Sequence, residues 1–196
     1  MTEAAHSLGY DDGLVRCNWP KDSQLYIDYH DAEWGVPLHG DDAMFERVAL
    51  EGFQAGLSWI TILNRRETFR TAFANFEMAT VAAFDEADIE RLMQDPGIIR
   101  NRAKVESTIR NAQLALQIPG GLSQFLWQFA PDRGAHSTPE TGFEWRATSQ
   151  ASEAMSKALR KLGFGFVGPT TMYALMQATG MYNDHSPECF RRAQLS

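Results

Sequence analysis

The sequence predicts an all-α fold. Apolar residues recur every three or four positions through most of the chain, which is the spacing of one face of a helix. The stripe along residues 101–118 is an example: Val105, Ile109, Ala112 and Leu116. Proline and glycine interrupt these stretches at 95–97 and 119–121. The alternation of apolar and polar residues that is typical of strands competes only weakly, at 164–167.

Length and composition indicate one globular unit. The chain has 196 residues, of which 44% are hydrophobic, enough for a real core. We expect a loosely ordered extension over residues 1–15 and a single domain over 16–196. The two cysteines are too few for a disulfide framework, and no signal peptide or membrane-spanning run is evident. These features predict a cytoplasmic protein with no membrane partner, and with no evident coiled coil we expect a monomer.

The elements can be placed in order. Residues 16–37 combine many aromatic side chains with turn residues, which favours a folded loop region. Helices are expected from 41 to a stop at Gly56, from Ser58 to about 76, and briefly over 78–84. Asp85 begins a capped helix with Asp88 as its capping acid. A long helix follows over 101–118, then a short helix capped by Ser123. Residues 131–148 read as a loop.

A glutamate occupies an unexpected position in the second of these stretches. If the helix that begins at 41 continues, Glu51 shares its face with Met44, Val48 and Ala55. An unpaired acid on an apolar face either costs several kcal/mol or has its pKa raised. Trp59 would lie at the following helix–helix corner, so that acid and indole frame a pocket. The alternative is a structural glutamate bonded to backbone, with the indole as core filler.

A glycine-rich hairpin joins two helices near the C-terminus. The helix over 152–162 stops at Gly163, and Pro169 opens the next helix, which closes before Gly180. This arrangement, over 152–179, resembles the helix-hairpin-helix motif of DNA-binding proteins. Its glycines, Gly163, Gly165 and Gly168, would leave backbone N–H groups uncovered for a DNA phosphate. A plain packing unit is the alternative.

Two cysteines and two histidines form a candidate metal set. Cys17 and His30 lie near the N-terminus, and His185 and Cys189 lie near the C-terminus. Thiolate with imidazole suits Zn²⁺, and four protein ligands make a structural site. The alternative is two independent buried thiols with unrelated histidines. If the metal site exists, it ties the two ends of the chain together.

These features together resemble the 3-methyladenine-DNA glycosylase I family, the zinc-containing branch of the helix-hairpin-helix DNA glycosylases. The matching stretches cover nearly everything from residue 16 to residue 189. They are RCNW, LYIDYHDAEWGVP, LEGFQAGLSWITILNRRETFR, DPGIIRNRAKVESTIRNA, KALRKLGFGFVGPTTMYALMQATG and NDHSPEC.

The resemblance implies an all-α fold with a lesion pocket between two packed helical lobes. It implies one structural zinc ion per chain, bound by Cys17, His30, His185 and Cys189. It also implies that Glu51 is catalytic and holds the excised base together with Tyr29 and Trp59. Trp19 and Tyr26 are expected as further aromatic residues of the pocket.

The implied function is repair of double-stranded DNA that carries alkylated bases. Methylation at N3 makes adenine cationic and therefore a good leaving group, so flipping and recognition matter more than a strong acid. Aromatic faces and a buried carboxylate suit a cation. No lysine follows Gly168 to form a Schiff base, which predicts a monofunctional enzyme that leaves an abasic site. Asp184 is expected to support the zinc site through its neighbour His185.

Two other functions compete with this one. A catalytically silent, zinc-stabilised DNA-binding module would share the hairpin and the metal, but it gains nothing from a buried acid. A metallohydrolase would need an open coordination position, and four protein ligands leave none. The net charge of −7 argues against broad DNA contact, so we expect a small basic face. Its candidates are Arg100, Arg102, Lys104, Arg160 and Lys161.

Overall fold

The computed structural model describes residues 6–131 and 146–195. Two short strands come first, β1 (Ser7–Gly9) and β2 (Val15–Cys17), followed by α1 (Gln24–Ala32), α2 (Asp41–Gln54), α3 (Trp59–Leu63) and α4 (Arg66–Ala72). The chain continues through the 3₁₀ turn η1 (Ala74–Phe76), α5 (Met78–Ala82), α6 (Glu86–Gln94), α7 (Arg102–Ala115) and α8 (Leu122–Trp127). The last elements are α9 (Gln150–Leu162), α10 (Pro169–Ala178) and α11 (Phe190–Gln194). The prediction of a mostly helical fold is confirmed.

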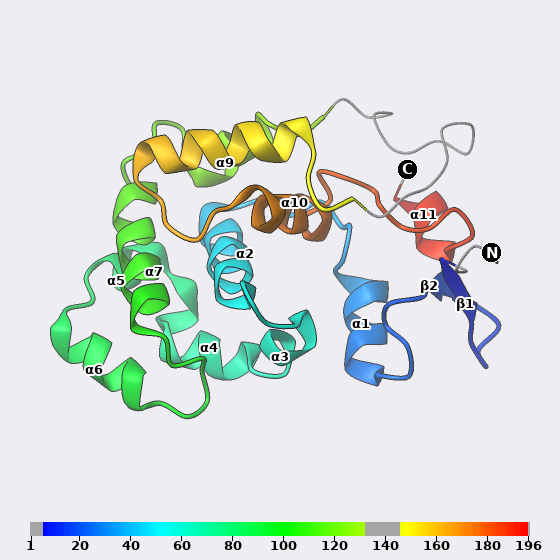
Figure 1. The fold of residues 1–196 in the computed structure, drawn as a ribbon, viewed down its shortest axis with the longest axis horizontal. Helices are drawn as coiled ribbons and strands as arrows, with labels where there is room; N and C mark the ends of the chain where they lie inside the picture. The colour runs from blue at the N-terminus through cyan, green and yellow to red at the C-terminus, as the bar shows by residue number, and fades with distance from the viewer. Residues whose placement is uncertain (1–5, 132–145, 196) are drawn as a thin grey trace.

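The helices form a large lobe around α2, which lies between α7, α8 and α10 (Figure 1). The core of this lobe is built from buried side chains of most of the helices from α2 to α10. Helix α2 is buried along its length because apolar residues occupy most of its circumference: Met44, Phe45, Val48, Ala49, Leu50 and Phe53. A charged side chain on this buried helix therefore loses its contact with water, which is costly unless a partner compensates for it.

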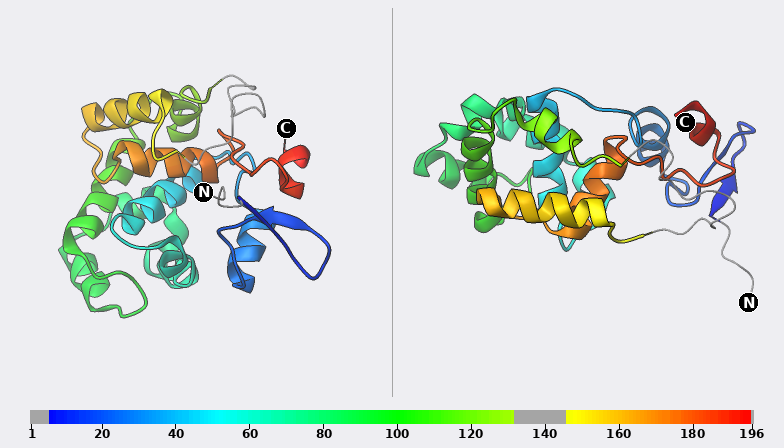
Figure 2. Two further views of the ribbon diagram at one scale, coloured as in Figure 1. Left: turned by 45° about the vertical axis from the view of Figure 1, so that its right-hand side comes forward. Right: turned by 90° about the horizontal axis from the view of Figure 1, so that it is seen from above.

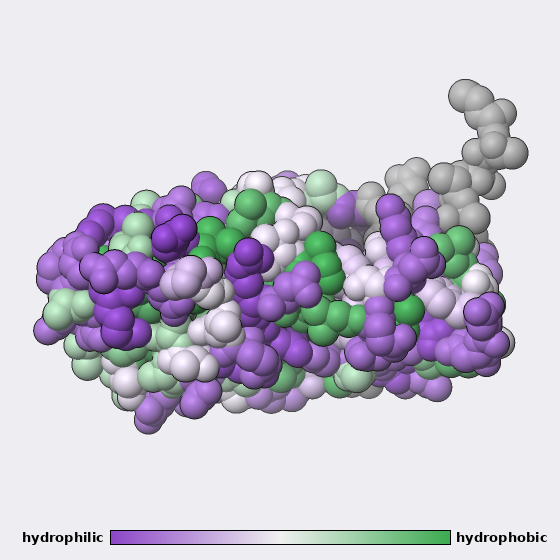
Figure 3. Space-filling view, turned by 90° about the horizontal axis from the view of Figure 1, so that it is seen from below, coloured by the Kyte–Doolittle hydropathy of each residue, from purple (hydrophilic) through white to green (hydrophobic). Residues whose placement is uncertain are grey.

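A smaller lobe gathers the two ends of the described chain. Helix α1, the β1–β2 pair and α11 lie together at one end of the molecule in every view (Figures 1 and 2). A second cluster of buried residues belongs to this lobe and to its contact with α3 and α10: Cys17, Tyr29, Trp34, Leu63, Ala178 and Cys189. The face seen from below is mostly hydrophilic, with hydrophobic residues interspersed toward its middle (Figure 3).

Residues 7–17 form a strand pair that the sequence did not predict. Strands β1 and β2 pair antiparallel, with Ser7 opposite Cys17 and Gly9 opposite Val15. The side chain of Ser7 contacts Ser186 and Glu188 near the other end of the chain. Each strand has three residues, which is too few for the alternation of a strand to be recognised, so the sequence did not predict this pair. Residues 7–15 therefore contain paired backbone that the sequence did not predict.

Several predicted helix ends are confirmed and others are corrected. Asp85 and Asp88 form the expected capping box of α6, and Gly163 ends α9 with a φ of +97°. The helix expected from Ser58 to about 76 is instead divided into α3, α4 and η1. Helix α8 begins at Leu122 with Gly121 as its N-cap, so Ser123 lies inside the helix, where its backbone N–H donates to Asp41 Oδ1 at 2.8 Å. Most of the predicted 131–148 loop lies outside the described residues.

Candidate active site and metal centre

A cavity of about 400 Å³ lies between the two lobes. Its lining includes every base-binding candidate of the sequence, Trp19, Tyr26, Tyr29, Trp59 and Glu51, and adds Gln177 from α10. These residues come from four separate parts of the chain. The volume is that of a small-molecule site with an apolar wall and few polar groups.

Glu51 lies on α2, one turn before that helix ends. Glycine at position 56 has a φ of +83°, so the chain turns away there and α3 begins at Trp59. The Glu51 residue is 4% exposed, and its Oε2 atom has no hydrogen-bond partner within residues 6–131 and 146–195. Burial raises the pKa of Glu51 to about 8, and the charge of Arg47 opposes this rise. A buried carboxyl without a partner does not stabilise the fold, so its position at a cavity wall indicates a role in binding a ligand.

Aromatic rings form most of the cavity wall. Trp19 and Tyr26 meet edge to face at 5.2 Å between ring centroids, and Tyr29 and Trp59 lie 5.5 Å apart. The hydroxyl of Tyr26 accepts a hydrogen bond from the backbone N–H of Ile60 at 3.0 Å, which joins α1 to α3. The indole N–H groups of Trp19 and Trp59 have no partner among the described residues. The residues of the cavity wall therefore combine ring faces, a buried carboxyl and two indole N–H groups that no described residue satisfies.

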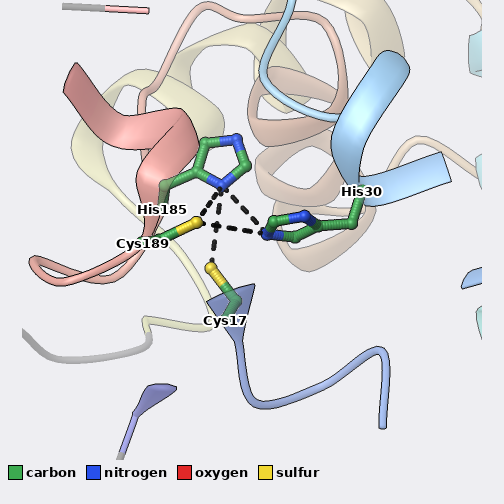
Figure 4. Close-up of side chains that lie close together, drawn as sticks. All are labelled: Cys17, His30, His185 and Cys189. Atoms are coloured by element: carbon green, nitrogen blue, oxygen red, sulfur yellow. Dashed lines mark hydrogen bonds between the residues drawn. The ribbon is translucent and has the colours of Figure 1, made fainter. Parts of the chain in front are cut away.

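The metal candidates converge although they come from opposite ends of the sequence. The ligand atoms of Cys17, His30, His185 and Cys189 all lie within 4.8 Å of one another, and all four residues are buried (Figure 4). His185 Nδ1 lies 3.7 Å from Cys17 Sγ, 3.4 Å from Cys189 Sγ and 3.2 Å from His30 Nε2. Tetrahedral Zn²⁺, with bonds of about 2.0–2.3 Å, needs ligand atoms roughly 3.3–3.8 Å apart. These residues fit a structural metal ion and confirm that the cluster joins the two ends of the chain.

Neighbouring groups fix the orientation of both histidines. Asp31 Oδ1 lies 2.7 Å from His30 Nδ1, and Arg16 holds Asp31 through its Nε and Nη2 atoms. The carbonyl of Trp34 lies 3.1 Å from His185 Nε2. Each imidazole thus turns its other nitrogen toward the cluster, as metal-binding histidines do.

The supporting carboxylate is Asp31, and not Asp184 as the sequence suggested. Asp184 Oδ2 accepts hydrogen bonds from the hydroxyl of Tyr173 at 2.6 Å and from Nε2 of Gln177 at 2.9 Å. It therefore faces α10 and orients a residue of the cavity wall. Sequence adjacency to His185 was a misleading signal, because successive side chains point in different directions.

The hairpin glycines serve different purposes. The N–H of Gly165 donates to Asn111 Oδ1 at 2.9 Å, and a Cβ atom there would lie 2.2 Å from Ser107 Oγ. The N–H of Gly163 donates to the carbonyl of Arg160. Gly165 thus packs the hairpin against α7. The expected phosphate contact consequently depends on Gly168 at the start of α10.

Sequence reasoning missed some residues around the cavity. Gln177 and Arg146 line it, and Arg47 lies beneath Tyr29 with its Cζ atom 5.5 Å from the ring centroid. Arg47 was detectable in principle, because it stands one helical turn before Glu51. Nothing in the sequence alone could bring Gln177 or Arg146 to the same cavity.

The fold and the site define a DNA glycosylase of the all-α type. The methyladenine glycosylase family matches residues 19–192 of the chain. The chain is 46% identical to DNA-3-methyladenine glycosylase 1 of Escherichia coli (strain K12) over 179 residues, which cover 90% of this chain and 96% of that protein. The chain therefore belongs to the methyladenine glycosylase family.

Solved structures agree with this assignment. A crystal structure of a 3-methyladenine DNA glycosylase I has a TM-score of 0.84 and 43% identity, with 89% of this chain and 98% of that chain covered. A structure that describes 3-methyladenine recognition by the enzyme from Staphylococcus aureus has a TM-score of 0.82 and 34% identity, with 90% and 96% covered.

Proposed function

We propose that this protein is a 3-methyladenine DNA glycosylase that acts in base-excision repair of alkylated adenine. The observation that carries the proposal is the unpartnered carboxyl of Glu51 within an aromatic cavity that lies between the lobes. Membership of the methyladenine glycosylase family supports it. An adenine methylated at N3 carries a positive charge on its base, and the cavity has the two features that bind a planar cation, ring faces and an acid.

The residues have distinct roles in the proposed reaction. The extrahelical base enters between Tyr29 and Trp59, with Trp19 and Tyr26 completing the wall, and each good cation–π contact contributes about 0.5–2 kcal/mol. Glu51 is the catalytic residue, because its carboxylate complements the charge of the base and of the sugar from which the base departs. Water then attacks C1′, and the product is an abasic site. The enzyme is monofunctional, since no lysine follows the hairpin.

The metal in this proposal is one structural Zn²⁺ per chain. Two sulfur and two nitrogen ligands favour zinc over harder cations, and four protein ligands leave no position for a substrate or a reactive water. When bound, the ion holds β2, α1 and the segment before α11 together. Trp19 and Tyr29 lie within two residues of a ligand, so the ion also fixes one wall of the cavity.

The proposed partner is double-stranded DNA that carries alkylated bases, bound by a monomer whose residues 16–196 act as one glycosylase domain. The start of α10 at Gly168 would contact a backbone phosphate, because helix N-termini present free N–H groups to anions. Arg160 lies beside it, with Nη2 3.5 Å from the position of a Cβ atom at Gly168. Among the described residues, no helix is long and apolar enough to cross a bilayer. We expect the enzyme to act in the cytoplasm.

A silent DNA-binding module remains the second candidate, because the hairpin and the metal centre alone are compatible with it. The test is release of free 3-methyladenine from methylated duplex DNA by wild type, Glu51→Gln and Glu51→Ala, each loaded with zinc. Rapid release by wild type and a loss of at least about a hundredfold in both variants are expected. A folded, zinc-loaded wild type that releases no base would instead support the binding module.

A further inference from the structure

A second charged residue of α2 is buried beneath the cavity. Arg47 precedes Glu51 by one helical turn and is 7% exposed. Its Nη2 atom donates to Glu33 Oε2 at 2.5 Å, and its Nη1 atom has no hydrogen-bond partner within the described residues. A buried guanidinium with a free donor is costly unless an anion compensates for it.

Glu33 cannot supply all of that compensation. It is already held at both oxygens by Arg66, whose Nη1 lies 2.7 Å from Oε2 and whose Nη2 lies 2.8 Å from Oε1. Such a two-point contact matches one carboxylate with one guanidinium. Arg47 is therefore the surplus cation of this group. The only other acid on its face of α2 at helical spacing is Glu51.

Arg47 does not line the cavity itself, but it contacts Tyr29, which does. Its Cζ atom lies 5.5 Å from the ring centroid of Tyr29, whose aromatic neighbours are Trp59, at 5.5 Å, and Trp19, at 6.3 Å. No ion pair within 4.0 Å joins Arg47 to Glu51 in the part of the chain that the structure describes. The guanidinium thus acts on the carboxyl through its field and leaves both carboxyl oxygens to the ligand.

The other charged or titratable groups near Glu51 are few. Tyr26 and Tyr29 face it from α1, and burial raises the pKa of both phenols, so they stay neutral. Arg146 lines the cavity. Lys104 reaches from α7 to the end of α2, where its Nζ atom donates to the carbonyls of Phe53 and Ala55. Asp184, beyond Gln177, is held by two hydrogen bonds.

We propose that Arg47 is a positioning residue for base excision, which favours the charged form of Glu51 and supports Tyr29 from below. This inference rests on the proposed function, since it assigns Glu51 to the binding of a cationic base. The positive charge that favours the Glu51 carboxylate comes from the guanidinium of Arg47 on the same helix. The carboxylate that pairs with Arg47, that of Glu33, is shared with Arg66. Burial alone would keep the Glu51 carboxyl protonated, and Arg47 opposes this.

The test compares Arg47→Met, which keeps the aliphatic volume, with Arg47→Lys, which keeps the charge. Arg70→Met is the matched control. Arg70 pairs with Glu46, the residue that precedes Arg47 on α2, and it does not line the cavity. The first readout is the ¹³C chemical shift of the Glu51 carboxyl against pH in each zinc-loaded protein, assigned with Glu51→Gln. The second is the pH profile of single-turnover excision from methylated duplex DNA, in which the lesion keeps its charge throughout.

Removal of the charge should raise the titration midpoint of Glu51 by about one pH unit or more, because an opposite charge at this range lowers a carboxyl pKa by roughly that amount. The acidic limb of excision should move upward equally, while Arg47→Lys and Arg70→Met stay near wild type. An unchanged Glu51 midpoint in Arg47→Met would overturn the inference. Because the NMR titration needs no turnover, a failure of the proposed function appears separately, as absence of base release by wild type.

Discussion

The buried carboxyl of Glu51 makes the stability of this protein depend on pH. The group titrates near 4.5 in an unfolded chain, and burial raises its pKa to about 8 in the folded state. Below pH 4.5 both states hold the proton and the group has no effect. Between pH 4.5 and 8 only the folded state retains it, so stability falls as pH rises. Above pH 8 the free energy of unfolding is lower than below pH 4.5 by the full effect of this group, about 5 kcal/mol at about 1.4 kcal/mol per pKa unit.

Glu51→Gln removes the titration while keeping the shape of the side chain. The free energy of unfolding of the variant, relative to wild type, should therefore increase by about 3–4 kcal/mol from pH 5 to pH 8. Any fixed cost of burying the amide cancels, because it does not change with pH. The assay is urea denaturation of the zinc-loaded proteins at half-unit steps of pH. Glu153→Gln, an exposed position in α9, is the control whose curve should run parallel to wild type. A parallel curve for Glu51→Gln as well would refute the reasoning.

Three further predictions concern other parts of the structure. Asp31→Asn should weaken zinc binding about 10- to 100-fold, since it removes the carboxylate partner of His30; competition with a chromogenic chelator measures this, and unchanged affinity would mean that Asp31 does not orient the imidazole. Gly165→Ala should lower the free energy of unfolding by about 1–3 kcal/mol, because its Cβ atom would meet Ser107 Oγ at 2.2 Å, whereas Gly168→Ala, with 3.5 Å of room, should be milder; equal losses would contradict the packing role. Removal of zinc by a strong chelator should lower the melting temperature and abolish the change in tryptophan fluorescence that a ligand causes. If both quantities stayed as they are in the zinc-loaded protein, the ion would be dispensable for the cavity wall.

The sequence predicted those parts of the site that depend on residue type and helical spacing. Glu51 was recognisable because an acid at that spacing falls on an apolar face, and the metal set was recognisable because thiols and imidazoles are few. The family resemblance supplied the aromatic residues. The structure brings the aromatic residues and Glu51 to one cavity and the four metal candidates to one cluster. Helical spacing and residue type can be read locally, which is why the sequence could indicate these residues.

What the sequence did not predict depends on distant packing. The β1–β2 pair is too short for a recognisable period, and its position is fixed by contacts of Ser7 with residues near the C-terminus. The role expected of Asp184 belongs to Asp31, because side-chain direction and not sequence adjacency decides which carboxylate meets an imidazole. The surplus charge of Arg47 appears only when Glu33 and Arg66 are seen together.

The junction of the two chain ends has a consequence for how the protein is made. Synthesis runs from the N-terminus, so Cys17 and His30 leave the ribosome long before His185 and Cys189 exist. If the metal fixes the aromatic wall beside Cys17 and His30, as proposed, that wall would be held in place only after the large lobe has been translated. A chain that stops before residue 185 would contain the residues of α2 and α10 but only half of the metal ligands. On the proposed function, competence for base binding would thus be acquired last, by molecules whose translation has passed the second cysteine.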